Sequence, residues 1–416
     1  MQDNTPETRT PSQGFIARQA VFDAARGIWG YEIYYRQNLD ASAPTDHKAL
    51  LEVATRAFLS PQWQHSPNSF LLVALDPQAD VADVTDVLPR GWTVLKVSEK
   101  QLMSPGTPEL LLTLRQKNYI IALGDFTGKL AGDPVLNLVD ILAVDMHRAN
   151  RDERVQAALR VKAQQPVQLL ARKVEDQESF NIVKEAGFSL FEGFYFQKPE
   201  PMASKGVSSS MAGSLGILRM IEQAEPDLSE LARTIQMDAS LSFRLLKFLN
   251  SPYFGFAREV SSIKVALILA GWQQMRTWLR LVVFTEMAPR NKPNELVFQS
   301  AQRGRFLELV AQGAGSRRAD SERLLLLGLF SLLDSIFDVP MPVLVGSLPL
   351  DQELKDTLCL KPTELLPWLE LAHCFERADW TQLASRCAEL EVDPEAVAAS
   401  YTQSMQWAHA IFSNLG

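Results

Sequence analysis

The sequence contains few cysteines. Cys359, Cys374 and Cys387 are the three among 416 residues, and they lie far apart in the C-terminal quarter of the chain. They have neither the Cys-x-x-Cys spacing of a zinc site nor the density of a disulfide framework. We therefore expect three reduced cysteines that pack in the core.

The sequence also lacks an excess of positive charge and any long apolar run. The formal net charge is −8, and no stripe of Lys and Arg is interleaved with aromatic residues, so nucleic-acid binding is not expected. The apolar runs, such as residues 324–327, are far too short to cross a bilayer. These absences predict a cytoplasmic protein with no membrane insertion.

The first half of the chain has no Gly-x-Gly-x-x-Gly phosphate loop. The stretches FIARQAVFD and IWGYEIYYR flank the turn-like AARG and predict a hairpin. Short apolar strands then alternate with segments long enough for a helix: SFLLVAL, WTVLKV, YIIALGD, ILAVD, VQLLA and LFEGFYF. This alternation predicts an α/β domain, a TIM-like (β/α) barrel over residues 14–196.

In such barrels the functional residues lie at the carboxyl ends of the strands. Most of the residues at these positions are acidic: Glu32, Ala74, Asp76, Glu99, Asp125, Asp145, Arg172 and Glu192. We therefore expect an acidic rim at one end of the barrel.

The second half changes period. Residues 197–214 are rich in Pro, Ser and Gly, which predicts a linker. Beyond it, apolar residues recur at three- and four-residue spacing, as in SLSFRLLKFLN and ERLLLLGLFSLLDSIF. This spacing predicts an all-α helical bundle over residues 215–416.

Two segments, in this order, resemble one family. FIARQAVFDAARGIWGYEIYYR resembles the opening of the EAL domain of EAL–HDOD bacterial signalling proteins. SELARTIQMDASLSFRLLKFLNSPYFG, followed by SSIKVALILAGWQQMRTWL, resembles their HDOD core. The resemblance covers about residues 14–416. It implies an EAL-type barrel, whose active members hydrolyse cyclic di-GMP with two divalent cations, followed by an HDOD bundle related to HD phosphohydrolases.

The resemblance assigns roles to the first barrel positions. Glu32 matches the signature Glu of the EAL motif, and Arg36 matches an Arg that contacts the dinucleotide. Ala74 stands where a metal-binding Asn is expected, and a methyl group cannot coordinate a cation. In the next strand Lys96 replaces the first acid of a Glu-x-Thr-Glu pattern, and Glu99 keeps the last.

The later positions depart further from the family pattern. Gly124 and Asp125 keep one of two adjacent carboxylates, and Asp145 remains although the lysine expected two residues earlier is an alanine. Arg172 replaces an acid, and Glu192 replaces a glutamine. Two-metal hydrolysis needs oxygen ligands and enough negative charge to offset the repulsion of cations about 4 Å apart. We therefore predict an inactive phosphodiesterase with no metal and no cofactor.

The helical half lacks the corresponding chemistry. An HD phosphohydrolase uses a His-Asp pair as metal ligands, and the matching segment LGLFSLLD has Ser331 and Leu332 at those positions. Metal-dependent hydrolysis is not expected there.

The sequence therefore favours a catalytically inactive scaffold that acts through protein–protein interaction in cyclic di-GMP-related regulation. Its expected partner is a regulatory protein such as a diguanylate cyclase or a kinase, and a homodimer is also considered. One alternative is an effector that binds cyclic di-GMP without hydrolysis, which Arg36 and Arg172 favour. Another is a residual phosphodiesterase, supported by Glu32, Glu99, Asp125 and Asp145.

A candidate interaction surface lies in the segment NSPYFGF. It places Tyr253, Phe254 and Phe256 on a turn, where full burial of three rings is difficult. The competing interpretation is that these rings pack between helices in the core.

Overall fold

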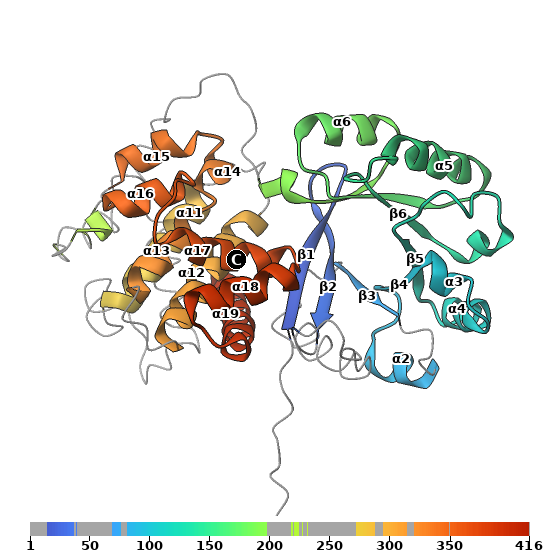
Figure 1. Ribbon diagram of the computed structural model, residues 1–416, viewed down its shortest axis with the longest axis horizontal. Helices are drawn as coiled ribbons and strands as arrows, with labels where there is room; N and C mark the ends of the chain where they lie inside the picture. Colours follow the sequence, from blue (N-terminus) through green and yellow to red (C-terminus); the bar gives the residue numbers. More distant parts are fainter. Residues whose placement is uncertain are drawn as a thin grey trace, which may run out of the picture.

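The chain folds into a barrel and a helical part that lie side by side (Figure 1). The computed structural model describes residues 15–36, 39, 69–75, 81–197, 218, 220–223, 227, 231, 272–287, 294–313, 320–348 and 350–415. The predicted linker from residue 198 onward lies outside these residues, as do Asp76, Tyr253, Phe254 and Phe256. The predicted domain boundaries stay predictions.

Eight strands form a closed barrel in chain order. Strand β1 runs antiparallel to its neighbours β2 and β8, and the other neighbouring strands are parallel. The strands are β1 (Phe15–Asp23), β2 (Ile28–Arg36), β3 (Phe70–Ala74), β4 (Thr93–Ser98), β5 (Ile120–Gly124), β6 (Ile141–Asp145), β7 (Gln168–Arg172) and β8 (Leu190–Glu192). The predicted barrel is confirmed, including its opening hairpin.

The last strand is shorter than predicted. LFEGFYF was expected to be a single strand, but β8 ends at Glu192, and the 3₁₀ helix η3 (Phe194–Gln197) follows. The break is at Gly193, whose φ is +152° and where an added Cβ would lie 2.2 Å from the carbonyl oxygen of Val174. Only glycine allows the two backbones to approach this closely.

Apolar side chains fill the barrel interior because alternate residues of each strand point inward. The innermost buried cluster takes at least one residue from seven of the strands: Val21, Leu72, Val94, Ala122, Ile141, Ala143, Leu170 and Leu190. Helices cover the outside: α2 (Val81–Val87), α3 (Glu99–Leu102), α4 (Thr107–Gln116), α5 (Arg151–Gln164) and α6 (Gln177–Glu185), with the 3₁₀ helix η2 (Pro134–Leu138).

The second part is helical, as predicted. Its described helices are α11 (Trp272–Met287), α12 (Asn294–Gly313), α13 (Ser321–Phe330), α14 (Leu333–Phe337), α15 (Met341–Ser347), α16 (Gln352–Leu358), α17 (Leu366–Glu376), α18 (Trp380–Leu390) and α19 (Pro394–Leu415). All three cysteines lie here as free thiols, and burial raises the pKa of Cys374 to about 11. Among the described helices, none combines the length and apolar character that a membrane span requires.

The two parts meet along the first two strands, as Figure 1 shows for β1 beside α17 and α19. The guanidinium of Arg18 on β1 donates to Glu295 on α12 at 3.0 Å, and the Tyr31 hydroxyl donates to the same carboxylate at 2.9 Å. The Phe15 ring lies 6.4 Å from Phe375 and 6.1 Å from Trp380. A buried ion pair and an aromatic cluster thus hold the barrel against the helices.

The Arg18–Glu295 pair provides a test of this interface. Glu295→Ala leaves the Arg18 charge buried without its carboxylate, so we expect a loss of about 3 kcal/mol in the free energy of unfolding, measured by urea titration. Glu389→Ala, which breaks the surface pair with Arg386, is the control and is expected to cost less than about 1 kcal/mol. Equal losses in the two variants would show that Arg18 is not buried at an interface.

Candidate functional site

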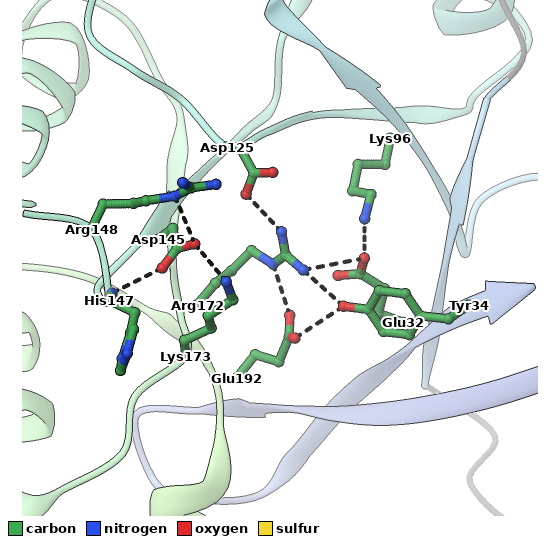
Figure 2. A network of polar contacts seen from close by, with 10 residues as sticks. All are labelled: Glu32, Tyr34, Lys96, Asp125, Asp145, His147, Arg148, Arg172, Lys173 and Glu192. Atoms are coloured by element: carbon green, nitrogen blue, oxygen red, sulfur yellow. Dashed lines mark hydrogen bonds and ion pairs between the residues drawn. The ribbon is translucent and has the colours of Figure 1, made fainter. Parts of the chain in front are cut away.

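A network of charged side chains lies at the carboxyl ends of strands β2 to β8, the barrel mouth, and is centred on Arg172 (Figure 2). Arg172 is the last residue of β7. Its Nη1 lies 2.8 Å from Asp125 Oδ1, its Nε lies 3.2 Å from Glu192 Oε2, and its Nη2 lies 3.7 Å from Glu32 Oε1. Nη2 also donates to the hydroxyl of Tyr34 at 2.8 Å. One cation therefore joins three carboxylates: Glu32 within β2, Asp125 just after β5, and Glu192 at the end of β8.

Lys96 adds a second cation to this network. Its ammonium group contacts the Glu32 carboxylate, which is fully buried. The stem of Lys96 fills space beside Gly124, because an added Cβ at residue 124 would lie 3.2 Å from its Cγ and Cδ atoms. A residue with a side chain at position 124 would therefore require the Lys96 stem to shift.

A second ion cluster surrounds Asp145 at the end of β6. The Lys173 ammonium group lies 2.8 Å from Asp145 Oδ2, and Arg148 Nε lies 3.6 Å from the same oxygen. The backbone N–H of His147 donates to Oδ1 at 2.8 Å. Burial opposes ionisation of Asp145, but these donors, with Lys173 the strongest, lower its pKa. The Lys173 side chain is half exposed, at 51%, so it can also reach a ligand.

Two strand tips adopt a left-handed backbone. Asp125 has φ of +56° and Lys173 has φ of +57°. This conformation is uncommon for residues with a side chain, and it is often found at functional sites. Here it occurs directly after β5 and β7. The Asp125 side chain contacts Arg172, and the Lys173 side chain contacts Asp145.

Glu32 and Glu192 have opposite pKa shifts. Burial opposes ionisation of Glu32, but Arg172 and Lys96 outweigh it and lower its pKa to about 2. Burial raises the pKa of Glu192 to about 7, an effect that Arg172 opposes and the Glu32 charge reinforces. Glu32 is therefore ionised at neutral pH, whereas the raised pKa of Glu192 places its titration near neutral pH.

The structure brings together some of the predicted site residues and separates others. Glu32, Asp125, Arg172 and Glu192 share one network, while Asp145 belongs to the neighbouring cluster (Figure 2). Glu99 instead begins α3 and accepts hydrogen bonds from the backbone and hydroxyl of Thr127, at 2.7 and 2.5 Å. It orders the loop after Asp125.

Arg36 and Ala74 are the last residues of β2 and β3. Arg36 pairs with Phe15 across the hairpin, and Ala74 pairs with Lys96 in the sheet. His147 points away, with 67% of its side chain exposed. Sequence reasoning missed Tyr34, which lies two residues after Glu32 and so on the same face of the strand.

The expected acidic rim is wrong. The acids are present, but Lys96, Arg148, Arg172 and Lys173 lie among them within ion-pair distance. The expectation included Arg172 but left out Lys96, Arg148 and Lys173, which reach the acids from neighbouring positions. The barrel mouth is a mixed, nearly balanced set of charges.

A cavity of about 590 Å³ opens between the barrel mouth and the helical part. The barrel contributes Tyr34, Arg172, Lys173 and Glu192 to its wall, and the helical part contributes Arg303, Ser331, His373 and Arg377. Its volume is typical of small-molecule sites. Ser331 and Leu332, which stand where an HD protein would carry its metal ligands, line this same cavity.

The described residues do not fit the two divalent cations that the family resemblance implies. The carboxylates of Glu32, Asp125 and Glu192 already surround the Arg172 guanidinium, so a metal ion there would face a fixed positive charge. Within the described ranges, no group of three or more His, Cys, Asp or Glu side chains is arranged to hold a metal ion.

Comparison with known proteins identifies relatives of the whole chain. Residues 213–337 match the HDOD domain family. "Cyclic di-GMP phosphodiesterase CdgJ" of Vibrio cholerae serotype O1 is 29% identical over 402 residues, covering 95% of this chain and 93% of CdgJ. The uncharacterized protein YuxH of Bacillus subtilis is 25% identical over 419 residues, covering 95% and 98%. The chain contains an HDOD domain and is homologous to both proteins, which confirms the resemblance predicted from the sequence.

A solved structure of the PaMucR phosphodiesterase in complex with c-di-GMP is also similar. It aligns over 45% of this chain and 92% of its own, with 17% identity and a TM-score of 0.39, a value too low to support a conclusion about this chain.

The relationship to CdgJ overturns the prediction of a catalytically inactive scaffold. That prediction treated the loss of two-metal ligands as the loss of enzymatic activity, yet a relative that aligns with 95% of the chain is named a phosphodiesterase. The prediction that the chain is not an enzyme is wrong for the same reason.

The raised pKa of Glu192 predicts a pH dependence of stability. Its folded pKa of about 7 exceeds the ordinary value of 4.5, so between these values the folded state binds more protons than the unfolded state. The Glu192 contribution is therefore fully present below pH 4.5 and is lost as the pH rises through 7. Glu192→Gln removes this titration and keeps an amide of similar shape.

We expect urea titrations of the wild type and Glu192→Gln at pH 5 and pH 8 to show the variant gaining roughly 1–3 kcal/mol relative to wild type at the higher pH. Glu389→Gln, on the exposed side of α18, is the control and is expected to show a constant difference. A constant difference for Glu192→Gln as well would contradict the raised pKa.

Proposed function

We propose that this chain binds cyclic di-GMP at the barrel mouth and hydrolyses one of its phosphodiester bonds. The observation that carries the proposal is the cavity of about 590 Å³, whose barrel wall presents Arg172, Lys173 and Glu192 together. The homology with CdgJ, which is named a cyclic di-GMP phosphodiesterase, supports the same ligand and reaction.

The cations of the barrel wall suit a ligand with two phosphates. Each phosphodiester of cyclic di-GMP carries one negative charge, and charge-assisted hydrogen bonds to such groups are about twice as strong as neutral ones. Lys173 is half exposed and extends from a strand end into the cavity wall. We assign Lys173 to direct phosphate contact. The donors of Arg172 are already engaged by protein groups, so we assign Arg172 to attract the phosphate through its charge without direct contact.

Hydrolysis adds one water molecule across one phosphodiester bond. The water oxygen bonds to phosphorus, the bond from phosphorus to the ribose 3′ oxygen breaks, and one proton of the water ends on that oxygen. Glu192 lines the cavity beside the cations and is held by Tyr34 and Arg172, at 3.1 and 3.2 Å. We assign it to receive the water proton during attack, because it is the buried carboxyl of the barrel wall that faces the ligand space.

We also propose that the protein acts in the cytoplasm, as expected from the sequence. The regulatory protein partner and the homodimer stay predictions.

The proposal is tested by incubating the purified full chain with cyclic di-GMP and quantifying the linear dinucleotide by chromatography, in Mg²⁺, in Mn²⁺ and with a chelator. We expect the wild type to form the linear product. Lys173→Gln is expected to raise KM about tenfold, the loss of one hydrogen bond to a charged group.

Lys162→Gln is the matched control. Lys162 is also an exposed lysine of the barrel, but it donates to the carbonyl of Gly187 at 2.6 Å, ahead of β8 and at the opposite end of the barrel from the mouth. Its KM is expected to equal that of the wild type. Absence of product from the wild type in all three buffers would refute hydrolysis, and equal KM values for the two lysine variants would refute the assignment of Lys173.

A further inference from the structure

The cavity wall that belongs to the helical part differs chemically from the barrel wall. It contains apolar side chains, among them Leu332, Met341 and Leu360, next to the polar groups of Ser331 and Arg377. Leu360 is 65% exposed. A ligand that spans the cavity would therefore meet cations on the barrel side and a largely apolar surface with a few polar groups on the helical side. A nucleotide matches these two walls, because its anionic phosphate suits the cations and its flat base suits the apolar surface.

The two arginines of the helical wall are in different situations. Arg303 is buried and donates to both carboxylate oxygens of Glu376, at 2.8 and 2.7 Å, and to the hydroxyl of Ser331 at 2.6 Å. Its charge is matched within the protein, so it serves the helical core. Arg377 is exposed and directly follows the last residue of α17.

Arg377 bridges the two parts of the chain. Its guanidinium carbon lies 4.3 Å from the centre of the Phe194 ring, which belongs to η3 of the barrel. Stacking on an aromatic ring orients the guanidinium plane and leaves its other face and its N–H edge for a ligand. Arg377 and Phe194 both line the cavity.

The electrostatics of the helical wall agree with an acceptor-rich ligand. Burial lowers the pKa of His373, and the neighbouring charges of Arg303 and Arg377 lower it further. The imidazole is therefore neutral at physiological pH. It neither adds to nor cancels the positive charge of Arg377. Asp334 also lines this wall, and burial raises the pKa of its carboxyl group. Arg377 is the exposed cation of the wall, and an electronegative ligand edge is its complement.

We propose that Arg377 recognises a guanine base of the dinucleotide whose phosphate is bound at Lys173. The paired N–H donors of arginine match the O6 and N7 acceptors of guanine, whereas adenine presents an amino group in place of O6. The contact with Phe194 holds the guanidinium of Arg377 at the cavity wall. The inference rests on the proposed function for its ligand, and it assigns base selection to the helical part of the chain.

The test measures the affinity of the full-length wild type, Arg377→Ala and Arg377→Lys for cyclic di-GMP and for cyclic di-AMP by calorimetry. We expect the wild type to prefer cyclic di-GMP. Both variants are expected to bind cyclic di-GMP about tenfold or more weakly, the typical value of one bidentate base contact, with little change for cyclic di-AMP. Lysine keeps the charge but loses the paired donors.

Arg386→Ala is the matched control. Arg386 is also a partly exposed arginine near α17, paired with Glu370 at 2.9 Å, and it does not line the cavity. It is expected to leave both affinities unchanged. Circular dichroism and melting temperatures of all variants establish that they are folded.

The outcomes separate the inference from the proposed function. If the wild type binds and hydrolyses cyclic di-GMP while Arg377→Ala has the same affinity, base recognition by Arg377 is refuted and the function stands. If Arg377→Lys retains wild-type affinity, the contact is a simple charge and the assignment to guanine is refuted. If the wild type binds neither dinucleotide, the inference and the proposed function both fail.

Discussion

The Arg172 guanidinium is the charge on which the barrel mouth depends. Glu32, Asp125 and Glu192 converge there from β2, β5 and β8, and the first and last of these carboxyl groups are buried. Glu32 and Glu192 repel each other when both are ionised, because little water screens buried charges, and this repulsion contributes to the raised pKa of Glu192. Arg172 and Lys96 supply the compensating charge from within the chain. Side chains of the protein thereby provide the positive charge that bound metal ions would provide in a metal-dependent site.

This arrangement determines how the rest of the molecule contributes. The barrel presents fixed cations to the cavity, and the helical part closes the other side with an apolar wall and Arg377. The Arg18–Glu295 pair and the aromatic cluster around Phe15 join the two parts that form these walls. A ligand in this cavity would thus contact both parts of the chain. This gives a physical reason for their covalent linkage.

The fold could be predicted from the sequence, and the site only in part. The strand pattern predicted the barrel because short apolar runs alternate with segments long enough for a helix. The bounds of several strands differ by one or two residues, and β8 differs most, since Gly193 allows a backbone contact that no pattern reveals. Motif matching selected Glu32, Asp125 and Arg172, and the structure brings these three side chains into one network. It did not reveal that Lys96 fills the space beside Gly124, or that Arg377 reaches Phe194, because both contacts depend on three-dimensional packing. Treating each lost ligand as lost function then led to the wrong conclusion about activity.

The central claim is that cations of the chain itself, in place of bound metal ions, attract the phosphates of the ligand. Calorimetric titration of cyclic di-GMP into chelator-treated full-length protein tests it most directly. The account predicts saturable binding of one dinucleotide per chain, with an affinity that added Mn²⁺ leaves unchanged and that weakens as salt rises. Binding that appears only after Mn²⁺ is restored would contradict it.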